Sequence, residues 1–160
     1  KPTQIIGHSD MAPSRKIDPG AKFPWERLYK EYGIGAWYDE ADKQRFMTDG
    51  SFKTATTLQI KQLFRDYGYA INESDDWDKP SRNVIYAFQL HFRPQNLTGK
   101  MDLETYAILR ALHNKYVENA NWFQEIISTP WLSLLTIANV MSWRQSLSGM
   151  YNEILWPALS

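Results

Sequence analysis

The chain contains 160 residues, with 18 lysines and arginines against 18 aspartates and glutamates and with no cysteine. This length allows one domain or two small ones, and the balanced charge gives no electrostatic reason to expect a nucleic-acid partner or an anionic membrane surface. A sequence without cysteine excludes disulfides and thiolate metal sites, and it is compatible with either the cytoplasm or the periplasm.

The N-terminal stretch contains an apolar pair followed by a loop rich in turn-forming residues. Ile5 and Ile6 lead into Gly7, a pattern that predicts a buried strand ending at a functional site. Pro13 and Pro19 limit the conformations of the loop that follows. We therefore expect side chains that are distant along this loop to meet at one point.

Three side chains of this loop, His8, Lys16 and Asp18, have the chemistry of a metal site. Neutral imidazole and carboxylate are good zinc ligands, and a zinc ion with three protein ligands keeps a position for an activated water. Lys16 is expected to stabilise an oxyanion beside the metal. The alternative for His8 is an ordinary surface or hydrogen-bonded histidine. Asp10 is expected to cap a turn or to bond the loop backbone.

The same run resembles the zinc-binding end of the N-acetylmuramoyl-L-alanine amidases of the amidase-2 type, and among these the AmiD-like enzymes of Gram-negative bacteria. The resemblance rests on residues 8–10, residues 15–20 and the Phe-Pro-Trp continuation at 23–25. It implies that His8 and Asp18 are zinc ligands and that Lys16 assists catalysis. It also implies a periplasmic enzyme at the outer membrane that cleaves the amide between N-acetylmuramic acid and L-alanine.

The family's site needs a further histidine ligand and a glutamate general base, and both come from a region before this motif. The other histidines of the chain, His91 and His113, fall in a different predicted domain and match no ligand position. Two protein ligands do not make a tight catalytic zinc site. We therefore expect this chain to be the C-terminal part of an amidase, truncated at its N-terminus and inactive by itself.

Residues 21–38 are expected to close the enzyme domain, which the sequence predicts at 1–38. They contain a predicted short helix that begins at Trp25 and a loop with two glycines that ends at Trp37. Both tryptophans fit either a position in the core or contact with substrate. Residues 39–51 are polar and include a glycine turn, so we interpret them as a linker.

From residue 52 to residue 116 the apolar pattern becomes helical three times, which predicts a small three-helix domain. Gly68 is expected to end the first helix as its C-cap. Ser81 is expected to cap the start of the second helix, which Pro94 then stops, and Asp102 caps the third. The predicted inward positions are Ile60, Leu63, Phe64, Tyr67, Val84, Ile85, Phe88, Phe92, Ile108, Leu109 and Leu112.

This order of helices resembles the type 1 peptidoglycan-binding domain. The matching features are Leu58-Gln59 in the first helix, Phe88-Gln89 in the second, a turn at Gly99, and Asp102 to Thr105 at the start of the third. The sequence departs from the family between residues 73 and 80, where the glycine usual before the second helix is missing. Gln59 and Gln89 are expected to tie helices to loops rather than to touch glycan. The two resemblances imply one ligand, peptidoglycan or its muropeptides.

Residues 117–160 differ in composition, with few charges and four tryptophans. Their apolar part is too short and too interrupted for a membrane span of about 20 residues. An interfacial helix usually carries several cations on its polar face, whereas Arg144 is alone here, so the sequence does not support membrane association through this tail. We expect a hydrophobic helical tail that packs on another part of the chain or on a partner. A membrane-associated interaction protein is a third alternative, and it rests on this tail alone.

Taken together, the sequence predicts a mainly α chain. It consists of a partial α/β amidase-2 domain at 1–38, a linker at 39–51, a three-helix peptidoglycan-binding domain at 52–116 and the helical tail at 117–160. The expected function is that of a zinc-dependent peptidoglycan amidase of the cell envelope. The alternative is a non-catalytic peptidoglycan-binding module that carries a remnant of the enzyme domain.

Overall fold

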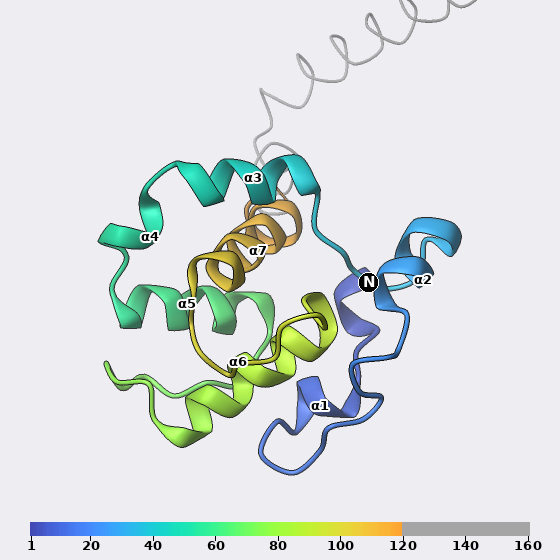
Figure 1. Ribbon diagram of the computed structural model, residues 1–160, viewed down its shortest axis with the longest axis horizontal. Coiled ribbons are helices and arrows are strands. Elements are labelled where there is room, and N and C mark those ends of the chain that lie inside the picture. The colour runs from blue at the N-terminus through green and yellow to red at the C-terminus, as the bar shows by residue number, and fades with distance from the viewer. Residues whose placement is uncertain (120–160) are drawn as a thin grey trace, which may run out of the picture. The chain divides into compact units, whose positions relative to one another are not determined.

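The structure is a computed structural model, and it describes residues 1–119. This part of the chain forms helices and connecting loops without a strand, so the expected mainly α fold is confirmed for it (Figure 1). The elements in chain order are η1 (Pro2–Gln4), α1 (His8–Met11), α2 (Trp25–Tyr32), α3 (Glu40–Thr48), α4 (Ser51–Thr54), α5 (Thr57–Tyr67), α6 (Lys79–Phe92), α7 (Leu103–His113) and the short η2 (Asn114–Glu118).

Three helices, α5, α6 and α7, enclose the main core, as their periodicity predicts. Phe64 of α5, Phe88 of α6 and Leu109 of α7 are completely buried. Phe64 and Phe88 meet edge to face with their ring centroids 5.3 Å apart, which places the positive edge of one ring against the negative face of the other. Figure 1 shows α7 between α5 and α3, and α7 packs on both. The predicted inward positions of the three helices are therefore confirmed.

Side-chain caps fix the limits of α5 and α7. Thr56 accepts the backbone N–H of Gln59 at 3.2 Å, and the Gln59 side chain accepts that of Thr56 at 2.8 Å, which forms a reciprocal capping box. Gly68 ends α5 with φ of 124°, and Asp102 begins α7 by accepting the N–H of Thr105 at 2.9 Å. The predicted roles of Gly68 and Asp102 are confirmed.

The cap of α6 differs from the prediction. Asp78 accepts the backbone N–H of Ser81 at 2.9 Å, so Asp78 is the N-cap and Ser81 lies inside the first turn. The prediction of Ser81 as the cap is wrong because Pro80 belongs to the helix. A proline is well suited to the first turn, where its missing N–H costs no intrahelical bond and its fixed φ matches the helix.

Helix α3 occupies most of residues 39–51, the range interpreted as a linker. It packs along α7, and Phe46 is buried there against Ala107 and Ala111. The guanidinium groups of Arg45 and Arg110 lie over the Phe46 ring, 4.4 and 4.8 Å from its centroid. This range therefore has a packed helical structure, although its composition is that of a solvated segment. The limits of the domains along the chain stay predictions.

The strand expected at Ile5 and Ile6 does not form in the described part of the chain. The backbone there is irregular, and the two side chains are 44% and 43% exposed. Both line a cavity of about 290 Å³, together with Met11, Tyr67 and Phe92. A strand needs a neighbouring strand to bond its N–H and C=O groups, and residues 1–119 contain none. The prediction of a buried strand is therefore wrong for this structure.

Helix α2 begins at Trp25, as predicted, and ends at Gly33, whose φ of 65° suits a helix C-cap. Trp25 and Trp37 are only 7% and 3% exposed, and both join the main core. Of the two alternatives for these tryptophans, the structure supports a position in the core. Because α2 also contacts α6, the segment before α3 packs directly on the three-helix domain.

The described part of the chain ends just after η2. There the Tyr116 hydroxyl accepts the N–H of Trp37 at 3.2 Å and donates to the Trp37 carbonyl at 3.1 Å. None of the helices within residues 1–119 combines the length and the apolar character needed to cross a membrane. The prediction of a hydrophobic helical tail at 117–160 falls, from residue 120 onward, outside the described residues.

Candidate functional site

The structure brings His8 and Asp18 together. His8 begins α1, Asp18 lies in the loop that follows, and imidazole Nδ1 is hydrogen-bonded to carboxylate Oδ2. Both side chains are open to solvent, with 74% and 55% of their surfaces exposed. The hydrogen bond with His8 is the largest cause that lowers the pKa of the Asp18 carboxyl below its usual value of 3.8. The pair is therefore accessible, and its carboxylate is ionised in neutral solution.

Backbone contacts hold the two residues in this arrangement. The N–H of Ser9 donates to the Asp18 carbonyl at 3.0 Å, and Ser9 is buried. Gly7 approaches the loop so closely that a Cβ atom there would lie 2.7 Å from Cδ of Pro19. A side chain at position 7 would therefore push the loop away, and only glycine permits this contact.

Lys16 lies on the same loop with its side chain exposed. Its backbone N–H donates to the carbonyl of Ala12 at 3.0 Å, which closes a turn between α1 and Asp18. Its charge adds to the influence of His8 in lowering the pKa of Asp18. No carboxylate within residues 1–119 forms an ion pair with Lys16. Its role in catalysis stays a prediction.

Asp10 is one of the two buried residues of α1. It accepts the N–H of Gly7 at 2.8 Å, which is the role expected from the sequence. It also accepts the hydroxyl of Tyr69 at 2.6 Å and lies 2.8 Å from Nδ1 of His91. Burial, followed by the charge of Asp10, raises the pKa of Tyr69 well above its usual value, so this hydroxyl stays protonated. Asp10 therefore connects α1 to the three-helix domain.

Sequence reasoning missed Tyr69 and His91 as neighbours of the loop. One signal for His91 was present, because it follows Val84 and Phe88 at helical spacing and so places an imidazole on the apolar stripe of α6. A buried polar group needs a partner, and that partner is Asp10. No sequence pattern identifies which carboxylate it is, since the two residues are 81 positions apart.

The histidines of the three-helix domain do not join His8. His91 contacts Asp10, and Nδ1 of His113 lies 3.1 Å from Glu118. Within residues 1–119, no group of three or more His, Asp or Glu side chains is placed to hold a metal ion. The imidazole and carboxylate of His8 and Asp18 have the donor chemistry that zinc prefers, and they supply two of its ligands. Zinc binding at this pair stays a prediction.

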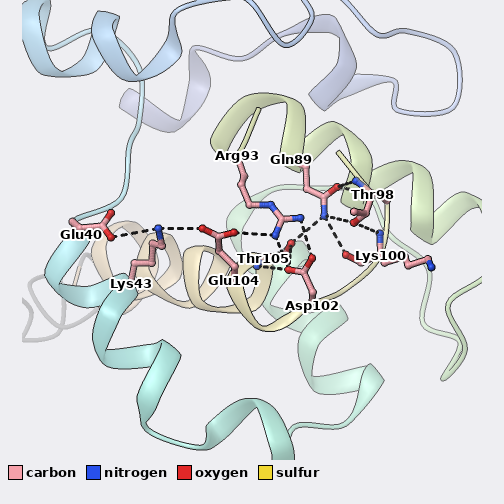
Figure 2. Close-up of polar contacts among 10 residues, drawn as sticks. Glu40, Lys43, Gln89, Arg93, Thr98, Lys100, Asp102, Glu104 and Thr105 are labelled. Carbon is pink, nitrogen blue, oxygen red and sulfur yellow. Dashed lines mark hydrogen bonds and ion pairs between the residues drawn. The ribbon is translucent and has the colours of Figure 1, made fainter. Parts of the chain in front are cut away.

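In the three-helix domain, one buried amide ties α6 to the turn that follows it. Gln89 is completely buried, and its carbonyl oxygen accepts the N–H groups of Thr98 and Gly99, both at 2.9 Å. Its Nε2 donates to the carbonyl of Lys100 at 3.1 Å and to the hydroxyl of Thr105 at 3.0 Å. Figure 2 shows the amide between the turn and α7. Gln89 thus has the structural role that the sequence predicts.

A chain of charged side chains runs from α3 to the start of α7 (Figure 2). Arg93 is buried and donates two hydrogen bonds to Asp102, at 2.8 and 3.0 Å, and one to Glu104 at 3.2 Å. Lys43 lies 3.2 Å from Glu104 and 3.3 Å from Glu40. Bidentate arginine–carboxylate pairs are among the stronger hydrogen bonds in proteins. This series of ion pairs therefore fixes α3 against the end of α6 and the start of α7.

Comparison with known families identifies the three-helix domain. Residues 53–109 match PG_binding_1, a family model for a peptidoglycan binding domain. The match spans α5 and α6 and reaches into α7, which are the helices that enclose the main core.

Known proteins are similar over a longer part of the chain. N-acetylmuramoyl-L-alanine amidase AmiD of Escherichia coli (strain K12) is 42% identical over 118 residues, which are 72% of this chain and 42% of AmiD. A 24-residue stretch, 15% of this chain, is 62% identical to 13% of the 1,6-anhydro-N-acetylmuramyl-L-alanine amidase AmpD of Haemophilus influenzae. This chain therefore spans less than half of the length of AmiD.

Solved structures agree with these relatives. AmpDh3 from Pseudomonas aeruginosa superposes with a TM-score of 0.67 at 45% identity, over 72% of this chain and 45% of AmpDh3, and it has also been solved in complex with anhydromuramic pentapeptide. AmiD from E. coli, in complex with the substrate anhydro-N-acetylmuramic acid-L-Ala-D-gamma-Glu-L-Lys, superposes with a TM-score of 0.62 at 39% identity, over the same shares. Over 72% of its length the chain is therefore similar to N-acetylmuramoyl-L-alanine amidase AmiD and to AmpDh3, and its residues 53–109 match the PG_binding_1 family.

Proposed function

We propose that this chain carries part of the active site of a zinc-dependent peptidoglycan amidase, which hydrolyses the amide between N-acetylmuramic acid and L-alanine. The observation that carries the proposal is the contact between His8 and Asp18 on an exposed edge. Its support is that the relatives AmiD and AmpD are amidases by name. Peptidoglycan or muropeptides are the ligand that we assign, because AmpDh3 and AmiD have been solved with anhydromuropeptides.

In this proposal His8 and Asp18 hold Zn²⁺ through an imidazole nitrogen and a carboxylate oxygen. Bound zinc supplies Lewis acidity toward a water molecule and toward the scissile carbonyl. The ionised Asp18 brings negative charge to the metal, and Lys16 offsets the negative charge that develops on the carbonyl oxygen. A catalytic zinc site uses three protein ligands, so this pair supplies only part of it. For that reason we expect the chain to be inactive when it is tested alone.

We also propose a location for the protein in the cell. Peptidoglycan is a ligand of the cell envelope, so we assign the protein to the periplasm at the outer membrane, as its resemblance to AmiD-like enzymes implies. The even balance of charge offers nothing to a nucleic acid. Membrane association through residues 117–160 is not part of the proposal.

Calorimetric titration with zinc tests the metal site. We compare the full chain with His8→Ala, and with His113→Gln as a matched histidine control away from the pair. Zinc should bind weakly at one site per chain, because the pair supplies only two ligands. The binding should disappear in His8→Ala and persist in His113→Gln. Lys16→Met should keep the zinc affinity, because Lys16 is assigned to the reacting oxygen rather than to the metal. Equal affinity in the full chain and His8→Ala would remove the basis for the amidase proposal.

The second candidate is a non-catalytic peptidoglycan-binding module. It is favoured by the family match at residues 53–109 and by the fact that the pair supplies only two ligands. Cosedimentation with purified peptidoglycan in the presence of EDTA, read together with the zinc titration, separates the candidates. A module should sediment equally well with or without EDTA and in His8→Ala. If sedimentation persists while the titration finds no zinc at His8, the module is the correct function.

A further inference from the structure

We propose that Tyr69 and His91 of the three-helix domain are positioning residues for His8 and Asp18, acting through the buried carboxylate of Asp10. The proposal rests on the proposed function only for the role of His8 and Asp18, since the contacts themselves are independent of any metal. It means that the peptidoglycan-binding domain also helps to hold His8 and Asp18, the candidate metal ligands, in place.

Helix α1 carries His8. This helix is a single turn, His8–Met11, and so short a helix is not stable without tertiary contacts. It packs on α6, and the only two of its residues that are buried are Ser9 and Asp10. The Asp10 side chain is only 4% exposed and receives donors from both Tyr69 and His91. The orientation of α1 therefore depends on these two partners.

The N-terminal segment contacts the His91 ring both at its edge and on one face. Nδ1 lies 2.8 Å from Asp10, and the ring of Trp25 stacks on the imidazole at 4.0 Å between centroids and 18° between planes. Nε2 is buried and has no hydrogen-bond partner within the described residues. A neutral imidazole with its proton on Nδ1 fits this environment, because it donates to the carboxylate and leaves no N–H group unpaired at Nε2.

Backbone contacts connect Asp10 to the exposed pair of His8 and Asp18. Both sequence neighbours of His8 are held: the N–H of Gly7 bonds Asp10, and the N–H of Ser9 bonds the carbonyl of Asp18. Gly7 also lies in close contact with Pro19, next to Asp18. A rotation of α1 that broke the Asp10 contacts would therefore move His8 and the Ser9 amide away from Asp18 together. The Ser9 amide proton is thus a local probe of the positioning.

Two substitutions at one position separate the hydrogen bond from packing. Asn and Leu have nearly the same shape, and both lose the imidazole stack on Trp25. Only the amide of His91→Asn can place an N–H donor where Nδ1 stood. We therefore compare His91→Leu, His91→Asn and the unchanged full chain by amide hydrogen exchange under native conditions.

In His91→Leu the Ser9 amide should exchange roughly tenfold faster or more, because a buried hydrogen bond to a charged group is lost. In His91→Asn it should stay within about threefold of the unchanged chain, since the donor is restored. The amide of Leu109, in the core of α7, serves as the internal reference for global stability. Equal exchange at Ser9 in His91→Leu and the unchanged chain would overturn the proposal.

Loss of protection at Leu109 in His91→Leu would show that the whole domain is destabilised. In that case we compare the Ser9 exchange rates of two milder variants, Tyr69→Phe and Tyr67→Phe. Each removes one hydroxyl, but the Tyr67 hydroxyl makes no hydrogen bond within residues 1–119, whereas that of Tyr69 bonds Asp10. Faster exchange at Ser9 in Tyr69→Phe alone supports the positioning role, and equal exchange in both variants refutes it.

Zinc titration of the same variants keeps the two proposals distinguishable. If the unchanged chain binds zinc at His8, its affinity should fall in His91→Leu and recover in His91→Asn, in parallel with the protection of Ser9. If the unchanged chain binds no zinc, the proposed function fails. The exchange rate of the Ser9 amide still decides whether Tyr69 and His91 position His8 and Asp18.

Discussion

Replacing Lys61 by methionine should destabilise the chain, because the ammonium group organises the loop before α6. Lys61 is completely buried. Its Nζ donates to Oδ1 of Asn72 at 2.7 Å, to the carbonyl of Ser74 at 2.9 Å and to the carbonyl of Asp76 at 2.7 Å. It also lies 5.5 Å from the centroid of the Trp77 ring. The loop thus wraps around one cation.

Methionine keeps an unbranched apolar stem, with sulfur in place of one methylene, and lacks the ammonium group. A hydrogen bond to a charged group contributes about 1.5–3 kcal/mol, and Nζ would lose four contacts, which include the Ser74 hydroxyl at 3.0 Å and which its three N–H groups share. Part of this loss is recovered, because the loop carbonyls can turn to water and because a buried ammonium carries its own desolvation cost. We therefore expect the free energy of unfolding to fall by about 2–4 kcal/mol in Lys61→Met.

Urea unfolding of the full chain, followed by far-UV circular dichroism, measures this difference. Lys53→Met is the matched control, because Lys53 is exposed on α4 and should change stability by less than about 0.5 kcal/mol. A loss below about 1 kcal/mol in Lys61→Met would refute the reasoning, since desolvation would then cancel nearly all of the hydrogen bonding.

Three further predictions use the same unfolding assay. Gly99→Ala should cost about 1–2 kcal/mol, because φ is 63° and the new Cβ would lie 3.3 Å from a carbonyl oxygen of α6; no loss would contradict this strain. Burial raises the pKa of Asp102, but hydrogen bonds from Arg93 and from the α7 cap lower it more, so the net pKa lies below 3.8. The advantage of the unchanged chain over Asp102→Asn should therefore be full above about pH 4 and shrink as the pH falls below it; a constant difference would argue against it. Tyr116→Phe removes both bonds to the Trp37 backbone and should cost about 1–2 kcal/mol, and an unchanged midpoint would show that water replaces them.

The parts of the fold that the sequence predicts are those encoded locally. The apolar periods of α5, α6 and α7 identify the buried positions, and Gly68 and Asp102 mark helix ends by their own chemistry. The contact of His8 with Asp18 is also local, since the two residues lie on α1 and on the short, proline-stiffened loop that follows it. At the start of α6 two good capping residues compete, Asp78 and Ser81, and the position of the proline in the helix decides between them.

The remaining features depend on partners that are distant in sequence. Helix α3 has one buried aromatic residue, Phe46, whose cover includes a guanidinium group from α7, so its composition resembles that of a solvated linker. The contact of Asp10 with His91 joins residues 81 positions apart, and neither residue signals the other. Ile5 has strand-like character, but a strand also requires a neighbour, which no local pattern reveals.

The packing of α3 on α7 limits how far the peptidoglycan-binding domain can move relative to His8. A binding module on a flexible tether lets its enzyme sample a volume set by the length of the linker. Here the segment between α2 and α5 does not act as a flexible tether, because α3 lies within it and is held in place by Lys43 and Phe46. The peptidoglycan-binding domain and the pair of His8 and Asp18 therefore stay at a constant distance from each other. Under the proposed function, one binding event on peptidoglycan would therefore fix which part of the ligand His8 can reach.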